Sequence, residues 1–387
     1  MTLSFLTLTI GIIDVAWMVV SLLAMFSILS FIVLSLTWLE RKALGRLQLR
    51  LGPTRTGPMG LLQPLADAVK LILKEDIVPT ASDKAIFWIA PVIVVISAFM
   101  IWVTIPGSQG LVLRNLELGL FYIIAFAVVG ILGLVLAGWG SANKYGVLGG
   151  LRSAAQLISY EIPVILVVVA VAMLAQSLDL TVIVNAQAKL PYIVLMPLGI
   201  VVFFIAGLAE VGRTPFDIYH AESEVVGGPF VEYSGAHWAV FFLAEYINTF
   251  AIAALTTLLF LGGWLGPFLP GIVWFLIKVY AVILVIFWIR GTFPRLRMDQ
   301  LMAFAWKTMV PLSFYLIVVT AIYLYFEWPW WTLTVMSSLG LLIVGYIIYS
   351  IMMAPVKKIA DIKARQQRMK LERSKMEESV GVAANVK

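Results

Sequence analysis

The sequence contains no cysteine, only two histidines and few charged residues. Without cysteine, the chain can form no disulfide, hold no thiolate-bound iron–sulfur cluster and supply no thiol nucleophile. The two histidines, His220 and His237, cannot make up a bis-histidine haem site or a typical structural zinc site. If the protein takes part in redox chemistry, the fixed electron carriers are therefore expected on other subunits.

Hydrophobic residues make up 62% of the 387 residues and charged residues only 12%. No soluble globular protein has this balance, so the composition indicates an integral membrane protein. The first ten residues carry no Lys or Arg, and a long apolar run follows Asp14. That run is too long for a cleaved signal peptide and predicts a first transmembrane helix.

Nine apolar runs are long enough to cross a bilayer core of ~30 Å, which needs about 20 residues. Backbone groups in lipid must be hydrogen-bonded within the protein, so each run is predicted to be a helix. The expected fold is all-α, a polytopic membrane helix bundle. The runs are roughly 14–39, 85–105, 117–140, 154–178, 190–210, 238–262, 271–290, 308–326 and 331–354.

The cations predict the orientation of the bundle. Of the 27 Lys and Arg residues, 24 fall in the loops after the first, third, fifth and seventh runs or in the C-terminal tail. Arg114 and Lys189 lie on the opposite side, and Lys278 lies within a run. The positive-inside rule then places the N-terminus outside and the C-terminus in the cytoplasm. The net charge of +6 reflects this topology, and no nucleic-acid partner is expected.

The first cytoplasmic loop, residues 40–84, contains the amphipathic sequence LLQPLADAVKLILKED. Its pattern predicts a short helix that lies at the membrane interface and does not span the bilayer. One face carries Leu61, Leu62, Leu65, Val69 and Ile72, and the other carries Asp67, Lys70 and Lys74.

A polar stretch, RTPFDIYHAESEVVGGPFVEYSG, occupies residues 213–235 between two apolar runs. Its flanking runs each carry a glutamate, Glu210 before it and Glu245 after it. Acids that gather at a membrane boundary and continue into the membrane suggest proton handling. The stretch itself contains Asp217, His220, Glu222, Glu224 and Glu232.

Four ionisable residues fall within or at the end of apolar runs: Glu161, Glu210, Glu245 and Lys278. Each would cost roughly 2.5–3.5 kcal/mol at bilayer depth, so they must face the bundle interior or a wet cavity. They could simply pair and join helices, or the carboxyl groups could carry protons. Three acids beside an acidic loop favour a proton path.

Seven motifs, in order over about residues 15–325, resemble the H-subunit family (subunit 1 in mitochondria) of proton-translocating NADH–quinone oxidoreductase, respiratory complex I. Each motif alone is weak, but the combination is specific. The motifs are WLERKALGRLQLRLGP, GLLQPLADAVKLILKED, AGWGSANKYGVLGGLRSAAQLISYEIP, AEVGRTPFD with AESE, VEYSG, FFLAEYIN and IRGTFPRLRMDQLM.

The resemblance implies a subunit of a translocase in the bacterial plasma (inner) membrane that helps form a quinone-reduction chamber. It implies no cofactor on this chain, quinone as substrate, and FMN and iron–sulfur clusters on partner subunits. The expected partners are peripheral-arm quinone-site subunits, antiporter-like membrane subunits and lipid. The quinone-binding residues implied are Glu40, Arg41, Asp67, Lys70, Arg213, Asp217, Glu222, Glu224 and Glu232. The proton path implied uses Glu161, Glu210, Glu245, His220 and Lys278.

The chain departs from this family in two places. The family's PFDLPEAE is PFDIYHAE here, so that Tyr219 and His220 replace a proline and an acid. The family also typically ends after eight helices, which divides this chain into residues 1–326 and an extra segment, 327–387. We expect the ninth helix of that segment to face lipid or another subunit and to take no part in quinone chemistry.

Two other kinds of function compete with this interpretation. Related membrane subunits, which also meet the peripheral electron-transfer arm, occur in ferredoxin- or F420-dependent dehydrogenases and in membrane-bound hydrogenases. The motifs do not identify the electron donor. A stand-alone ion transporter is a different class. The chain has no internal repeat of useful strength, and its long cytoplasmic loops suit docking, so both features argue against a transporter.

His220 can be tested directly. With an unperturbed pKa of about 6.5, a histidine could carry protons in place of the missing acid, or the position could simply tolerate the change. If His220 carries protons, replacing it with Ala or Gln should lower proton pumping and the quinone reductase rate, measured separately. Unchanged values for both would remove the hypothesis.

Overall fold

The structure is a computed structural model that describes residues 12–219, 222–343 and 345–346. One compact unit ends at Ser337, and the described residues after it belong to a second unit. Within the described ranges, seven helices are long and apolar enough to cross a membrane. The prediction of an all-α polytopic bundle is confirmed, and the chain is a multi-pass membrane protein.

Six of the seven spans are single helices, and the seventh contains a π-helical turn. The six are α1 (Ile12–Leu47), α3 (Lys84–Ile101), α4 (Gly119–Gly140), α5 (Lys144–Ala175), α10 (Gly235–Phe260) and α11 (Gly271–Thr292). The seventh consists of α12 (Met298–Phe304), the π-helical turn η3 (Ala305–Met309) and α13 (Val310–Tyr325). Two shorter apolar helices, α8 (Pro197–Val211) and Trp330–Ile343, fall in the fifth and ninth predicted runs.

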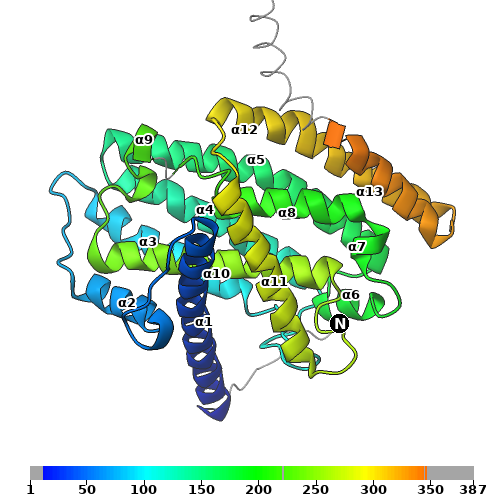
Figure 1. Cartoon of the computed structure of the whole chain (residues 1–387), viewed down its shortest axis with the longest axis horizontal. Helices are drawn as coiled ribbons and strands as arrows, with labels where there is room; N and C mark the ends of the chain where they lie inside the picture. Colours follow the sequence, from blue (N-terminus) through cyan, green and yellow to red (C-terminus); the bar gives the residue numbers. More distant parts are fainter. Residues whose placement is uncertain (1–11, 220–221, 344, 347–387) are drawn as a thin grey trace, which may run out of the picture. The chain divides into compact units, whose positions relative to one another are not determined.

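Helix α10 lies at the centre of the bundle. All of its residues from Thr249 to Phe260 are buried, and it contacts α1, α2 (Gln63–Leu73), α3, α8 and α11. A helix that is apolar on every side is expected to be surrounded by other helices. Figure 1 shows α1 and α11 crossing the same side of α10.

Several predicted helix boundaries are wrong: α1 continues to Leu47 and does not end near residue 39, and the seventh span begins at Met298 and not near residue 308. The fourth run was expected to begin near residue 154, but α5 begins at Lys144, where the Asn143 side chain accepts a hydrogen bond from Tyr145 N at 3.0 Å. This N-cap satisfies a backbone group that the helix itself cannot. The fifth run, expected as one helix over 190–210, is divided into α7 (Tyr192–Leu195) and α8, because Pro197 cannot continue the preceding helix.

The amphipathic helix expected in the first loop is confirmed as α2 (Gln63–Leu73). Its apolar residues Leu65 and Ile72 are 49% and 67% exposed, as expected for a helix whose apolar face is not covered by this chain alone. The other short elements are η1 (Pro58–Gly60), α6 (Leu180–Ala186), α9 (Glu222–Val225) and η2 (Gly228–Phe230).

Lys278 on α11 holds the backbone at the end of α10. Its ammonium group donates to the carbonyl oxygens of Leu261, Gly263 and Leu265 at 2.8, 3.0 and 2.8 Å. The C-terminal carbonyls of a helix lack partners within the helix, and a cation near them is favourable. This residue was expected on the proton path, and its contacts give it a structural role.

Replacing Lys278 with Met should leave these three carbonyl groups without their donor, at a cost of about 2 kcal/mol or more in stability. The midpoint of unfolding of the purified chain in detergent should fall accordingly. The control is Lys189→Met, which removes an exposed lysine. An unchanged midpoint of unfolding, together with loss of proton pumping by the assembled complex that carries the same substitution, would instead indicate that Lys278 carries protons.

Candidate functional site

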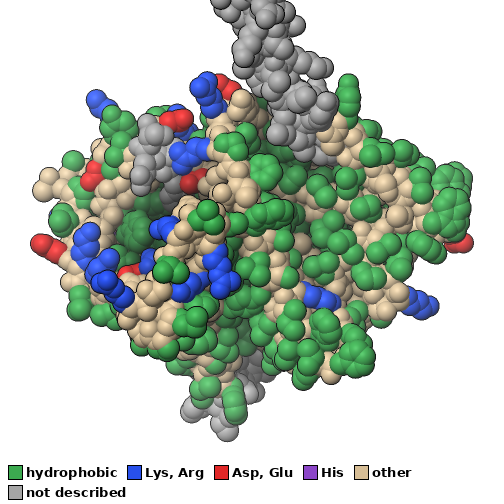
Figure 2. Space-filling model, viewed as in Figure 1, with side chains coloured by type: hydrophobic (Ala, Val, Ile, Leu, Met, Phe, Trp, Pro, Cys, Tyr) green, Lys and Arg blue, Asp and Glu red, His purple; other side chains and the backbone are tan. Residues whose placement is uncertain are grey.

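A polar cavity of about 980 Å³ lies where the segment after α8 meets α10 and the end of α11. Three arginines and two acids line it together with aromatic side chains of α10. In Figure 2, Lys and Arg side chains gather around a hollow on the left of the visible face. The charged lining residues are Arg213, Asp217, Glu245, Arg290 and Arg295.

Arg213 is the most deeply buried cation of this cavity, with its side chain 6% exposed. Its Nη1 lies 3.0 Å from Glu245 Oε1, and its guanidinium lies 4.5 Å from the ring centre of Tyr246. Burial alone would lower the pKa of Arg213, but Glu245, Tyr246, Tyr219 and Asp217 together raise it above its ordinary value. The guanidinium is therefore a permanent positive charge in the wall of the cavity.

A second charge pair joins the first helix to the seventh predicted run. Glu40, buried near the end of α1, pairs with Arg290 at the end of α11. Tyr246 donates from its hydroxyl group to the other oxygen of Glu40 at 2.5 Å. Tyr246 thus connects Glu40 to the Arg213–Glu245 pair, and both carboxylates have a cationic partner, as buried charges require.

The backbone after α8 is held in place by close contacts. Gly212 ends α8 with φ of 67°, and an added Cβ would lie 2.0 Å from the Tyr219 hydroxyl oxygen, so only glycine fits. Burial raises the pKa of the Tyr219 phenol well above its ordinary value, so it stays protonated and donates to Val211 O at 3.4 Å. Gln156 of α5 donates to Ala209 O and Phe216 O, both at 2.7 Å.

An apolar cavity of about 380 Å³ lies between α1, α2 and α10. Its only charged lining residues are Arg41 and Asp67. Arg41 Nη1 lies 2.5 Å from Asp67 Oδ2. Phe242 of α10 lines both this cavity and the polar one. Its ring packs between Trp238 and Tyr246, with ring centres 5.2 and 4.6 Å away. The two cavities therefore lie on either side of an aromatic row on α10.

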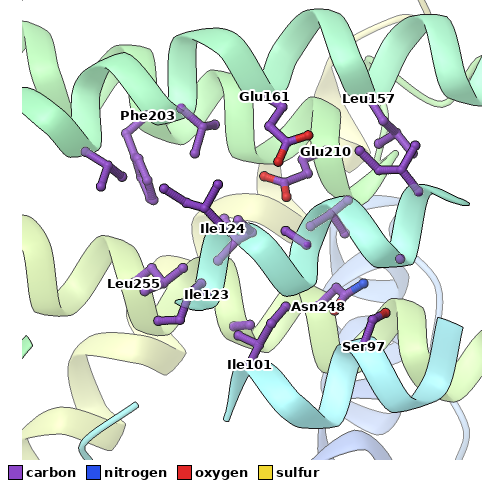
Figure 3. A pocket seen from close by; sticks show the side chains of 18 of the residues that line it. Ser97, Ile101, Ile123, Ile124, Leu157, Glu161, Phe203, Glu210, Asn248 and Leu255 are labelled. Carbon is purple, nitrogen blue, oxygen red and sulfur yellow. The ribbon is translucent and has the colours of Figure 1, made fainter. Parts of the chain in front are cut away.

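A third, small cavity of about 80 Å³ lies among α3, α4, α5, α8 and α10. Figure 3 shows the carboxylates of Glu161 and Glu210 pointing toward one another inside it, with Asn248 nearby. Glu161 Oε1 and Glu210 Oε2 are buried and have no hydrogen-bond partner among the described residues. A carboxyl group in such an environment can hold a proton, whereas two adjacent carboxylates would repel each other.

Several expected site residues lie outside these three cavities. Glu224 pairs with Arg152 at 2.6 Å, and Glu232 accepts a hydrogen bond from Asn143 at 2.5 Å. Lys70 is exposed on α2. His220 and the side chain of Glu222 fall outside what the structure describes.

The sequence also left important residues unassigned. Arg290, Arg295 and Tyr246 belong to the quoted motifs, but none of the three was predicted as a site residue. Arg290 could have been predicted as a site residue from the sequence, because it is a cation placed at the end of an apolar run. No local signal marks Asn248 or Gln156, because a lone amide in a helix is common.

Comparison with known proteins agrees with the motifs. A family model described as NADH dehydrogenase matches residues 20–321. Relatives include the H subunit of NADH-quinone oxidoreductase from Dehalococcoides mccartyi, 47% identical over 79% of this chain and 86% of the relative. The corresponding protein of Brevibacillus brevis is 47% identical over 79% of this chain and 93% of the relative. The chain therefore belongs to the NADH dehydrogenase family, represented by the H subunits of NADH-quinone oxidoreductase.

Proposed function

We propose that this chain forms the membrane part of a quinone-reduction chamber and couples quinone reduction to proton translocation through buried carboxyl groups. The observation that carries the proposal is the pair of cavities that share Phe242, one polar and one apolar. A quinone needs both, because its headgroup accepts hydrogen bonds and its isoprenoid tail is apolar. Ligand sites commonly combine apolar walls with a few polar groups.

The polar cavity suits the headgroup. Reduction of a quinone to a quinol adds two electrons and two protons, and the electrons come from carriers on partner subunits. Arg213, Arg290 and Arg295 stabilise negative charge that develops on the headgroup oxygens. Asp217 and Glu245 keep these cations in place and are near enough to exchange protons with the site. Lys70, Glu224 and Glu232 are not included in this chamber.

The apolar cavity suits the tail. It is lined by α1, α2 and α10, and an opening between these helices at the membrane boundary would give a lipid-dissolved molecule access. Arg41 and Asp67 lie at its polar rim, and Glu40 lies at the junction with the polar cavity through Tyr246. These three residues are proposed to guide the headgroup from the apolar to the polar side.

Coupling runs along α10. Glu245 lines the polar cavity, and Asn248, almost one helical turn later, lines the small cavity that contains Glu161 and Glu210. Negative charge on the headgroup weakens the hold of Arg213 on Glu245, so Glu245 takes up a proton more readily. That change shifts the protonation of the next acids, and the apparent pKa values belong to the coupled set of carboxyl groups.

The proposed chamber also gives the orientation of the chain in the membrane. The arginines of the polar cavity and the loop that bears α2 belong to the cation-rich side of the chain, which the positive-inside rule places in the cytoplasm. The N-terminus would then lie outside the bacterial plasma membrane, and the C-terminal tail would lie in the cytoplasm. The cytoplasmic ends would meet the peripheral-arm subunits, and the acid path would lead to antiporter-like subunits.

The acid path can be tested with Glu210→Gln in the assembled complex. The amide keeps the size of the side chain and cannot transfer a proton, so we expect the coupled quinone reductase rate to fall about tenfold or more. Proton pumping measured in vesicles should fall at least as far. The control is Glu117→Gln, which removes an exposed acid. Normal pumping by Glu210→Gln would exclude this residue from the path.

The role of Arg213 can be separated from its role in folding. Arg213→Gln leaves the partly buried Glu245 without its cation, which should cost about 3 kcal/mol of stability and most of the activity. Arg213→Lys keeps the charge but not the planar fork, so assembly should recover while the KM for quinone stays raised. Quinone titrations of both complexes provide the measurement, with Arg114→Gln as the exposed control. A normal KM in Arg213→Lys would mean that only the charge matters.

A further inference from the structure

The start of α10 is attached to the chain segment that leaves α2. His237 Nδ1 pairs with Asp76 Oδ2, and Ile77 N donates to Ser234 Oγ at 3.0 Å. The backbones also touch, since a Cβ on Gly235 would lie 3.0 Å from Lys74 O. These contacts join residues more than 150 positions apart in the sequence.

His237 is the fixed side of this attachment. Its ring packs edge-on against Phe87 and Trp88 of α3, with ring centres 5.8 and 4.3 Å away, and its side chain is 9% exposed. Tyr233 lies on a third side and donates from its hydroxyl to Phe87 O at 3.3 Å. Aromatic packing therefore holds the imidazole still, with Nδ1 against the Asp76 carboxylate.

Helix α2 has few contacts of its own that hold it against the bundle. Pro64 is its only buried residue, and its packing partners are α1 and α10. Near its beginning it is tied to α1 by the Arg41–Asp67 pair. Beyond its end it is tied to α10 by Asp76. Of the α2 side chains that line the apolar cavity, Ala68, Leu71 and Ile72 lie between these two attachments.

We propose that Asp76 and His237 form a clamp that positions α2 over the apolar cavity and thereby sets how well the cavity accepts a quinone's tail. This inference rests on the proposed function, because it assumes that the tail occupies the cavity. Both residues act as positioning residues: neither lines the apolar or the polar cavity. Loosening the clamp lets the end of α2 move and removes part of the wall that the tail contacts.

The test compares two quinones with the same headgroup in the assembled complex, one with a single isoprene unit and one with a full-length tail. Asp76→Ala and His237→Phe both remove the pair, and phenylalanine keeps the packing against Phe87 and Trp88. Because Asp76 is partly exposed, we expect a rise of about threefold in the KM for the long-tailed quinone. The KM for the short-tailed quinone and kcat for both should stay unchanged.

The matched control is Glu75→Ala, which removes the neighbouring exposed carboxylate. The double variant Asp76→Ala/His237→Phe should be no worse than either single variant, because both remove the same contact. Should Asp76→Ala fail to assemble, Asp76→Asn keeps an acceptor for the imidazole N–H and should show a smaller shift in the same direction. Equal KM changes for the two quinones, additive single effects or no change would overturn the proposal.

Hydrogen exchange separates the clamp from the proposed function. The amides of residues 74–77 should exchange faster in both single variants than in the wild-type complex, with Ile77 the most affected. Unchanged exchange would show that the pair does not hold the segment. If the variants exchange faster but the wild-type complex reduces neither quinone with its electron donor, the proposed function fails and the clamp remains.

Discussion

The pair formed by the buried Arg213 and the partly buried Glu245 imposes the strictest requirement on this structure. Removing a charge from water costs several kcal/mol, so each partner must stay within reach of the other. Arg213 belongs to a connecting segment, and such segments move unless they are held. Gln156 supplies two hydrogen bonds that tie this segment and the end of α8 to α5, and the tight fit of Gly212 against Tyr219 fixes its first turn. The arrangement around α8 therefore follows from the need to keep one cation beside one acid.

Helix α10 contributes side chains to all three cavities, each at a different part of its surface. Phe242 separates the polar cavity from the apolar one, Glu245 faces the polar cavity, and Asn248 faces the small cavity of Glu161 and Glu210. Side chains three or four positions apart are neighbours on a helix, so Glu245 lies next to residues that line both of the other cavities. The C-terminal half of α10, from Thr249 to Phe260, is fully buried and mostly apolar, which gives these residues a rigid support.

The sequence predicted the helices well because their signal is long and local. A run of about 20 apolar residues identifies a span whatever it packs against. The errors came where a local feature divides or extends a run, as Pro197 does before α8 and Asn143 does before α5. The site was harder to predict, because its contacts join distant positions. Nothing near Glu40 indicates Arg290, and nothing near Asp76 indicates His237.

The polar contacts also explain how an apolar bundle obtains one arrangement of its helices. Apolar faces of neighbouring helices can slide past each other at little cost in lipid, where hydrophobic burial no longer drives association. A buried hydrogen-bonding group has no such freedom, since a shift of one residue would leave it unpaired. Glu40 with Arg290 fixes α1 against α11, and Lys278 fixes α11 against the end of α10. Because α11 is held near both of its ends, Arg290 has a fixed place in the wall of the polar cavity.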